Sequence, residues 1–539
     1  MVTAHTSELS AVRVPDTFNI ASYFIDRNLE LGHGSKTALY EDGRTINYEQ
    51  LAAMVNRCGN ALRALDIEVE NRVLMALPDS AEFVATFFGA AKIGAVPVPV
   101  NTAARPDDYL YYLNDSGAQA FVLHDELWPQ LQAVLARAPR LRHVIVVPAV
   151  PAQTREVSAQ PPTGAHYSFH TLKEVARGAS SKLEAEPTSK DDVAFFLYTS
   201  GSTGGPKGAV HLQHDMLFAT EYYARGILQM TDNDIAFSAS KLFFAYGLGN
   251  GMYFPLGVGA ASVMNPHRPK PETIYEYLEK FRPTLFFGVP TLYASMLQIP
   301  DKKDLSSVRF GVSAGEALPP EIFQRFQERF GVSILDGIGS TEMLHIFVSN
   351  RPDDIRPGTS GKIVPGYESK IVDDAGNALP GGELGNLWVK GDSAAAFYWR
   401  KHDLSKRIMI GEWLVTGDKY YVDEQGYHYY CGRSDDMLKV AGQWVSPAEV
   451  ENALLGFPGV LEAAVVGLED SDGLVKPKAF LVMKDTPGAS TPGTNKDEEL
   501  RNFLREKLAG FKCPRWFEYV SELPKTPTGK IQRFKLRAR

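Results

Sequence analysis

The sequence predicts an α/β protein in which a large N-terminal domain of helix-covered β-sheets precedes a small α+β C-terminal domain. With 539 residues the chain is too long for one hydrophobic core, so we expect at least two domains. Short apolar runs alternate with amphipathic helical patterns over most of the chain, which favours parallel sheets covered by helices. The pattern shortens from Asp435 onward, so we place the domains at residues 1–434 and 435–539.

The elements follow from these runs in chain order. In the large domain, strand-like runs lie at 72–77, 120–125, 143–148, 284–290, 309–315 and 333–342, and helical patterns lie at 80–94, 290–298 and 319–331. In the small domain we expect helices at 446–457 and 497–511 and strands at 462–469 and 476–484. The segments 148–165 and 485–496 have loop composition. Ligands of such folds bind at the carboxyl ends of strands.

The segment from Tyr198 to Gly208 reads YTSGSTGGPKG and follows an apolar strand-like run. Glycines allow close backbone approach, and exposed N–H and hydroxyl donors with a lysine suit a polyphosphate. It is not a Walker A loop, because Pro206 precedes the lysine and a glycine follows it. The candidate phosphate-binding residues are Thr199, Ser200, Gly201, Ser202, Thr203, Gly204 and Lys207.

Two further segments, SAGEALP from Ser313 and DGIGSTE from Asp336, also begin where predicted strands end. Shared placement at the carboxyl ends of strands is our reason to treat them and the glycine-rich segment as one site. In the second of them a hydroxyl at Thr341 stands beside the carboxylate of Glu342. Such a carboxylate suits an Mg²⁺ ion that also contacts substrate phosphates.

The order of these segments resembles the adenylate-forming enzymes, which include acyl-CoA synthetases, luciferases and peptide-synthetase adenylation domains. The resemblance implies that Thr341 contacts the α-phosphate of ATP and that Glu342 binds Mg²⁺. It assigns two nucleotide-binding sets, namely Gly315, Glu316, Ala317, Asp336, Gly337 and Ile338 around the adenine, and Asp418 and Arg433 at the ribose. Most relatives carry tyrosine where this chain has Ile338, so aromatic stacking on adenine is not expected there.

The resemblance also covers the C-terminal region. It implies that Lys530, in PKTPTGKIQR, holds the carboxylate and α-phosphate during adenylation, where its charge is worth roughly 3 kcal/mol or more. Asp435 is the expected hinge about which the small domain rotates. Lys439 and Gly442 belong to the segment that would bind nucleotide or approach the thioester-forming site after rotation. Few residues follow Lys530, so we expect no fused carrier domain.

Two segments, KLFFAYGLGNG from Lys241 and GIGSTEMLHIF from Gly337, resemble the aromatic acyl-CoA synthetases. This implies a flat aryl-acid pocket lined by Ala245, Tyr246, Gly339, His345 and Ile346. Benzoate is the expected acid, with ATP, Mg²⁺ and coenzyme A as cofactors and cosubstrate. A hydroxy- or aminobenzoate, a separate carrier protein as acceptor, or a catalytically inactive nucleotide-binding relative are the alternatives.

Composition excludes other classes of partner. The formal net charge of −8 argues against nucleic acid or an anionic membrane as the main partner. Three cysteines, Cys58, Cys431 and Cys513, in no metal-ligand spacing suggest a reducing compartment. We find no signal pattern and no membrane span, so we expect a cytoplasmic protein, and we leave a homodimer open.

Overall fold

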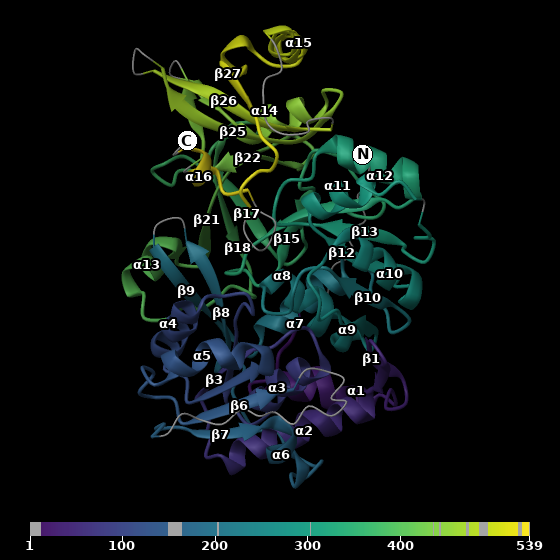
Figure 1. Cartoon of the computed structure of the whole chain (residues 1–539), viewed down its shortest axis with the longest axis vertical. Helices are drawn as coiled ribbons and strands as arrows, with labels where there is room; N and C mark the ends of the chain where they lie inside the picture. Colours follow the sequence, from purple (N-terminus) through teal and green to yellow (C-terminus); the bar gives the residue numbers. More distant parts are fainter. Residues whose placement is uncertain are drawn as a thin grey trace.

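The computed structural model describes residues 12–148, 164–201, 204–301, 303–434, 436–440, 443–470, 474–484, 494–525 and 531–537. It is an α/β protein: one helix-covered sheet lies at the bottom of Figure 1, a second lies above it on the right beside a third sheet, and a small C-terminal α+β unit lies at the top. The predicted fold class is therefore confirmed. All three cysteines are free thiols. Within the described ranges, no helix is both long and apolar enough to cross a bilayer.

The first sheet is parallel throughout, in the order β4-β3-β5-β6-β7. Its strands are Arg72–Ala76 (β3), Val96–Pro99 (β4), Ala120–His124 (β5), His143–Val147 (β6) and Ser168–Thr171 (β7). The helices that accompany it are Tyr48–Ala64 (α2), Ala81–Lys92 (α3), Pro106–Ser116 (α4), Trp128–Leu135 (α5) and Leu172–Arg177 (α6). Helix α3 is apolar on nearly all sides, so it is buried, and the Ser80 hydroxyl caps its first turn.

The second sheet has the order β16-β15-β14-β13-β12-β10-β11-β1-β2 and is parallel from β14 to β1. Its strands are Thr37–Glu41 (β1), Arg44–Asn47 (β2), Ile235–Ser238 (β10), Ala261–Val263 (β11), Leu285–Gly288 (β12), Phe310–Ser313 (β13), Ile334–Gly339 (β14), Ile346–Ser349 (β15) and Lys362–Ile363 (β16). The short N-terminal helices are Ser22–Asp26 (η1) and Arg27–Glu30 (α1).

Helices cover both faces of this second sheet. Alternate residues of β12 enter different cores: Leu285 and Phe287 enter one, and Phe286 enters the other. The core that includes Phe286 is completed by Pro271–Phe281 (α10), Pro290–Gln298 (α11) and Pro320–Phe330 (α12). The opposite face packs against Asp215–Ala219 (α7), Thr220–Arg225 (η3), Ala245–Leu248 (α8), Gly249–Tyr253 (η4) and Phe254–Val258 (α9).

A third sheet and a hairpin complete the large part. The sheet comprises Glu368–Val372 (β17), Gly385–Lys390 (β18), Met409–Ile410 (β20), Trp413–Val422 (β21) and His428–Arg433 (β22). The hairpin comprises Val193–Gly201 (β8) and Gly204–Leu212 (β9), with Phe397–Tyr398 (β19) beside β9 and His402–Ile408 (α13) after it. The glycine-rich segment thus lies in an antiparallel hairpin. Our placement of it at the carboxyl end of a parallel strand was wrong, because an apolar run does not reveal the direction of its partner strand.

The C-terminal part has its own core, which includes Leu438, Val465 and Leu481. It contains Leu438–Val440 (β23), Gln443–Val445 (β24), Pro447–Leu455 (α14), Val460–Glu469 (β25), Val475–Met483 (β26), Thr494–Arg505 (α15), Gly510–Lys512 (η5), Trp516–Tyr519 (β27) and Arg533–Arg537 (α16). The predicted helix over 497–511 ends earlier, at Arg505. The domain boundary stays a prediction, since Asp435 lies outside the described residues.

Candidate functional site

Lys207 projects from the glycine-rich hairpin toward the loop that joins β14 to β15. Strand pairing sets Lys207 opposite Thr199, next to the turn between β8 and β9. The Lys207 Nζ lies 3.2 Å from the Oε1 of Glu342, and both side chains are largely buried. The structure therefore brings the predicted phosphate lysine and the predicted magnesium carboxylate together. Ser202 and Thr203 lie outside the described residues, and only the backbone is described at Ser200, Gly201 and Gly204.

Tyr398, which the sequence did not single out, joins these two charges. Its hydroxyl accepts a hydrogen bond from the Lys207 Nζ at 2.7 Å and donates one to the Glu342 carboxylate at 2.5 Å. The Lys207 ammonium also lies 4.2 Å from the centre of the Tyr398 ring. Tyr398 stands in β19, which pairs with β9, so the sheet fixes its position. No local pattern could have found it, because its partner lies 191 residues away in sequence.

Glu342 is suited to an anionic role. Burial alone would raise the pKa of its carboxyl, but the Lys207 charge and the Tyr398 hydroxyl more than offset this, and the pKa is lowered. A single charged carboxylate fits Mg²⁺, which keeps waters and substrate phosphates as its other ligands. Within the described ranges no group of three or more His, Cys, Asp or Glu side chains could hold a metal. A dedicated all-protein metal cage is therefore not part of the described chain.

The backbone of Thr341 is hydrogen-bonded to a buried histidine, His211. The Nε2 of His211 lies 2.9 Å from the Thr341 carbonyl oxygen, and its Nδ1 lies 2.7 Å from the Oδ2 of Asp215. Both side chains are fully buried. The loop that carries Thr341 is thereby anchored to strand β9, which also carries Lys207. The sequence gives no sign of this role of His211, because a buried histidine has no distinctive spacing.

The segment from Ser313 lies beside the start of DGIGSTE, as predicted, because Ser313 pairs with Asp336 across the parallel strands β13 and β14. Asp336 itself lies within β14. Its Oδ2 accepts a hydrogen bond from the Leu318 N–H at 3.2 Å, and burial raises the pKa of this carboxyl to about 8. Gly315 has a φ of 91°, which favours glycine.

Glu316, in the same segment, contacts the C-terminal part. Its Oε1 accepts a hydrogen bond from the Ile531 N–H at 3.2 Å. Ala317 completes this turn before α12, and Gly337 and Ile338 follow Asp336 in β14. The structure thus places the chain immediately after position 530 against the predicted adenine segment, although Lys530 lies outside the described residues.

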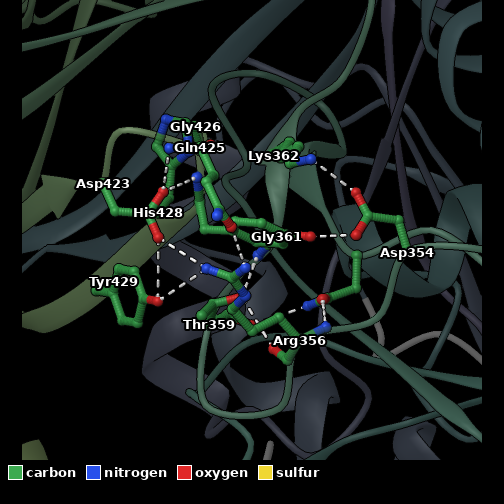
Figure 2. Close-up of polar contacts among 12 residues, drawn as sticks. Asp354, Arg356, Thr359, Gly361, Lys362, Asp423, Gln425, Gly426, His428 and Tyr429 are labelled. Atoms are coloured by element: carbon green, nitrogen blue, oxygen red, sulfur yellow. Dashed lines mark hydrogen bonds and ion pairs between the residues drawn. The ribbon is translucent and has the colours of Figure 1, made fainter. Parts of the chain in front are cut away.

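Asp418 and Arg433 lie opposite each other on β21 and β22. The Nη1 of Arg433 lies 3.3 Å from the Oδ1 of Asp418, and Arg433 is about half exposed. Figure 2 shows how the same strands are fixed to the loop before β16. There Arg356 donates to Asp423 at 2.8 Å, and the His428 N–H donates to the carbonyl of Gly361 at 2.8 Å.

The five predicted aryl-pocket residues lie on two segments, helix α8 and the segment from the end of β14 to the start of β15. The Tyr246 hydroxyl donates to the carbonyls of Gly288 and Val312 at 3.2 and 3.1 Å. The His345 ring is buried, and its centre lies 5.6 Å from that of Tyr246. Burial lowers the pKa of His345 to about 3, so its ring is neutral near pH 7. Ala245 and Ile346 are buried beside them.

Gly339 is required by a close approach in this segment. A Cβ at this position would lie 2.4 Å from the backbone oxygen of His345, which is closer than real contacts allow.

Of the remaining predicted residues, Lys439 lies exposed on β23, and its Nζ is 5.7 Å from the Trp444 ring centre. Gly442 and Asp435 lie outside the described residues.

Comparison with known proteins agrees with this geometry. Residues 27–399 match the family described as AMP-binding enzyme, and residues 449–530 match the AMP-binding enzyme C-terminal domain. A benzoate–CoA ligase of Thauera aromatica is 48% identical and covers 100% of this chain and 99% of its own. A 4-hydroxybenzoate–CoA/benzoate–CoA ligase of Rhodopseudomonas palustris is 41% identical, covering 96% and 94%. The solved anthranilate CoA ligase AuaEII in complex with anthranoyl-AMP superposes with a TM-score of 0.90 at 41% identity, covering 97% and 98%.

Proposed function

The chain belongs to the AMP-binding enzymes, and from this premise we propose that it ligates an aromatic carboxylic acid, benzoate, to coenzyme A. The reaction consumes ATP and yields benzoyl-CoA, AMP and pyrophosphate. The similar benzoate–CoA ligase and the matched family support this activity. We also propose that it acts in the cytoplasm, in keeping with its three free thiols.

One observation carries the proposal. The short connection from β14 into β15 holds Thr341 and Glu342 near one end and His345 at the other, next to Ile346 at the start of β15. The charged end contacts Lys207, and the other end contacts the ring of Tyr246. A flat apolar acid bound against Tyr246 and His345 would therefore present its carboxylate toward the groups that bind phosphate. Small apolar residues with aromatic walls suit an aryl ring.

In the first half-reaction, a carboxylate oxygen of the acid attacks the α-phosphorus of ATP. The bond from that phosphorus to the bridging oxygen breaks, and pyrophosphate leaves. Lys207 and the hydroxyl of Thr341 bind the phosphates, Asp418 and Arg433 bind the ribose, and Lys530 stabilises charge at the α-phosphate. Mg²⁺ held by Glu342 would supply neutralisation of phosphate charge.

In the second half-reaction the sulfur of coenzyme A attacks the acyl carbonyl carbon. The bond from that carbon to the phosphate oxygen breaks, AMP leaves, and the thiol proton passes to solvent. The thiol needs a path to a carbonyl that Lys530 covered before, so the small domain must move between the two steps. We propose rotation about Asp435, which would carry Lys439 and Gly442 toward the site. A homodimer stays a prediction.

The test is benzoate-dependent exchange of labelled pyrophosphate into ATP, followed by detection of benzoyl-CoA with coenzyme A as the sole acceptor. We expect both, with kcat/KM higher for benzoate than for octanoate. ADP and phosphate as nucleotide products would contradict adenylation. Exchange without acyl-CoA formation would favour the loading of a separate carrier protein. Equal kcat/KM for benzoate and octanoate would contradict the aryl-acid assignment.

A further inference from the structure

Helix α4, from the first sheet, lies against the hairpin of β8 and β9 that carries the glycine-rich segment (Figure 1). The hydroxyl of Tyr111, in α4, donates to the carbonyl oxygen of Pro206 at 2.7 Å. The hydroxyl of Tyr198 donates to the Oδ2 of Asp115, also in α4, at 2.7 Å. Since Pro206 belongs to β9 and Tyr198 to β8, the helix holds both strands of the hairpin.

The same end of α4 also holds the chain that follows β19. The indole N–H of Trp399 donates to the carbonyl oxygen of Asp115 at 2.8 Å, and the Nη1 of Arg400 donates to that of Asn114 at 3.2 Å. The backbone N–H of Trp399 donates in turn to the carbonyl of Gly208, in β9, at 2.8 Å. The helix, the hairpin and the chain after β19 are therefore bonded to one another in all three combinations.

These contacts flank the charged groups of the candidate site. Pro206 directly precedes Lys207, and Trp399 directly follows Tyr398. Lys207 and Tyr398 are hydrogen-bonded to each other, and Tyr398 is hydrogen-bonded to Glu342. Helix α4 therefore holds the immediate neighbour of each of these two residues, so a displacement of the helix contacts would be passed on to Lys207 and Tyr398.

The position of Asp115 is unfavourable for the helix itself. Asp115 lies in the last turn of α4, where the free carbonyls carry partial negative charge and a carboxylate is repelled. The hydrogen bond from Tyr198 offsets this repulsion, because bonds to a charged acceptor are among the strong ones. Burial and the Asp115 carboxylate raise the pKa of Tyr198, so its hydroxyl keeps its proton and remains the donor. The contact with the hairpin, and not helix stability, therefore accounts for a carboxylate at this position.

We propose that Tyr111 and Asp115 are positioning residues, which orient the hairpin so that Lys207 meets the β- and γ-phosphates of ATP. The two residues lie on one face of α4, since they are four positions apart. An orientation that is fixed in advance reduces the entropy that binding costs. This inference rests on the proposed function and names what holds its phosphate-binding hairpin in place.

The proposal separates ATP from AMP. AMP has the α-phosphate alone, which the proposed function assigns to Thr341 and Lys530, so its binding should not depend on the contacts of α4. The same holds for benzoyl-adenylate, which also lacks the β- and γ-phosphates. Loss of the α4 contacts should therefore weaken the binding of ATP and of pyrophosphate and leave that of AMP and benzoyl-adenylate unchanged.

The test measures the Kd of ATP and of AMP by calorimetry with Mg²⁺, on the full chain and without an acid. The variants are Tyr111→Phe and Asp115→Ala. We expect the Kd of ATP to rise about fivefold in each, as loss of one hydrogen bond implies, and that of AMP to stay unchanged. The control is Tyr109→Phe in the same helix, whose hydroxyl donates to the Asn101 carbonyl at 2.8 Å; it should change neither Kd.

Turnover gives a second readout. In each variant, the KM for pyrophosphate in the conversion of benzoyl-adenylate to ATP should rise by a similar factor. Thioester formation from supplied benzoyl-adenylate and coenzyme A should keep the kcat/KM of the wild type. A variant that merely loosened the fold would lower both activities together.

A third variant guards against a local effect of either substitution. Tyr111→Phe also loses an interaction with Lys401, whereas Tyr198→Phe removes the same hydrogen bond as Asp115→Ala from its other end. Tyr198→Phe should therefore reproduce the effect of Asp115→Ala on the Kd of ATP, and a Kd equal to that of the wild type would overturn the role of Asp115.

Two further results would overturn the proposal: an unchanged Kd of ATP in both variants, or equal rises in the Kd of ATP and of AMP. The second would mean that α4 only supports the fold. If the wild type binds ATP but no aryl acid supports pyrophosphate exchange, the proposed acid substrate fails, and the comparison of ATP with AMP still decides the role of α4.

Discussion

Tyr398 shows how a residue far away in sequence can govern a charged pair. Its hydroxyl stands between the ammonium of Lys207 and the carboxylate of Glu342. A hydroxyl bonded to both side chains fixes the orientation of the ammonium and of the carboxylate. The ammonium and the carboxylate also form a direct ion pair at 3.2 Å.

We therefore expect Tyr398→Phe to weaken adenylation. Hydrogen bonds to charged groups are worth about 1.5–3 kcal/mol, which corresponds to roughly a tenfold to hundredfold loss in kcat/KM for ATP. Pyrophosphate exchange measured against Mg²⁺ concentration should show the loss as a higher Mg²⁺ requirement. The matched control is Tyr275→Phe, which removes a hydroxyl that donates to the Met296 carbonyl in a separate core. An unchanged Mg²⁺ requirement in Tyr398→Phe would argue against the proposed role of Glu342.

The buried carboxyl of Asp336 makes stability depend on pH. Its pKa is raised to about 8 by burial, whereas in the unfolded chain it ionises near 3.8. Its favourable contribution is therefore complete below about pH 4 and is lost as the pH rises toward 8, by about 1.4 kcal/mol per pH unit.

Asp336→Asn removes this dependence. The free energy of unfolding of the variant, relative to that of the wild type, should rise steadily between pH 5 and pH 8. Urea unfolding of the large domain at several pH values measures the difference. Parallel pH profiles for the two proteins would show that the carboxyl is ionised in the folded state.

At the scale of elements, much of the architecture could be predicted. The helices at 290–298 and 319–331 match α11 and α12 closely, since proline at their starts and the amphipathic pattern are local signals. Strand direction could not be predicted for the hairpin of β8 and β9, because pairing depends on segments distant in sequence. The same reason hid Tyr398 and His211, whose roles exist only after β9, β19 and the β14–β15 turn have assembled.

The end of β14 leaves no room for a side chain at Gly339. Its Cβ would meet the backbone oxygen of His345 at 2.4 Å, and backbone cannot move aside cheaply. We expect Gly339→Ala to destabilise the protein by about 1–3 kcal/mol and to impair benzoate use through displacement of His345.

Thermal unfolding and pyrophosphate exchange measure the two effects. The control is Gly178→Ala, where φ is −97° and nothing lies within 4 Å of the added Cβ. That variant should be as stable as the wild type or slightly more so. Equal Tm values for both alanine variants would contradict the close approach at Gly339.

At the scale of the whole molecule, the hydrogen bond between Glu316 and Ile531 joins the C-terminal part to the large part. It holds the C-terminal segment against the predicted adenine segment. The small part is also braced internally, because Arg533 donates to Glu451 at 2.7 Å. This braced unit could therefore swing as one body about the predicted hinge.

We expect two variants to separate the half-reactions. Lys530→Ala should cripple adenylation but largely spare thioester formation from supplied benzoyl-adenylate, because its charge serves only the α-phosphate step. Asp435→Pro restricts φ at the hinge and should impair thioester formation more than adenylation. Each half-reaction is measured separately in both variants. If Lys530→Ala slowed both half-reactions equally, the proposal that Lys530 serves adenylation alone would have to be abandoned.

The three free cysteines offer a way to observe the predicted rotation of the small domain. Burial raises the pKa of the Cys58 and Cys431 thiols to about 12, so both react poorly, whereas Cys513 on the small part is less buried. A maleimide dye should therefore label Cys513 first in the native protein, without removal of the other two. Energy transfer from that dye to a fluorescent ATP analogue would then follow, molecule by molecule, when the small domain leaves the nucleotide.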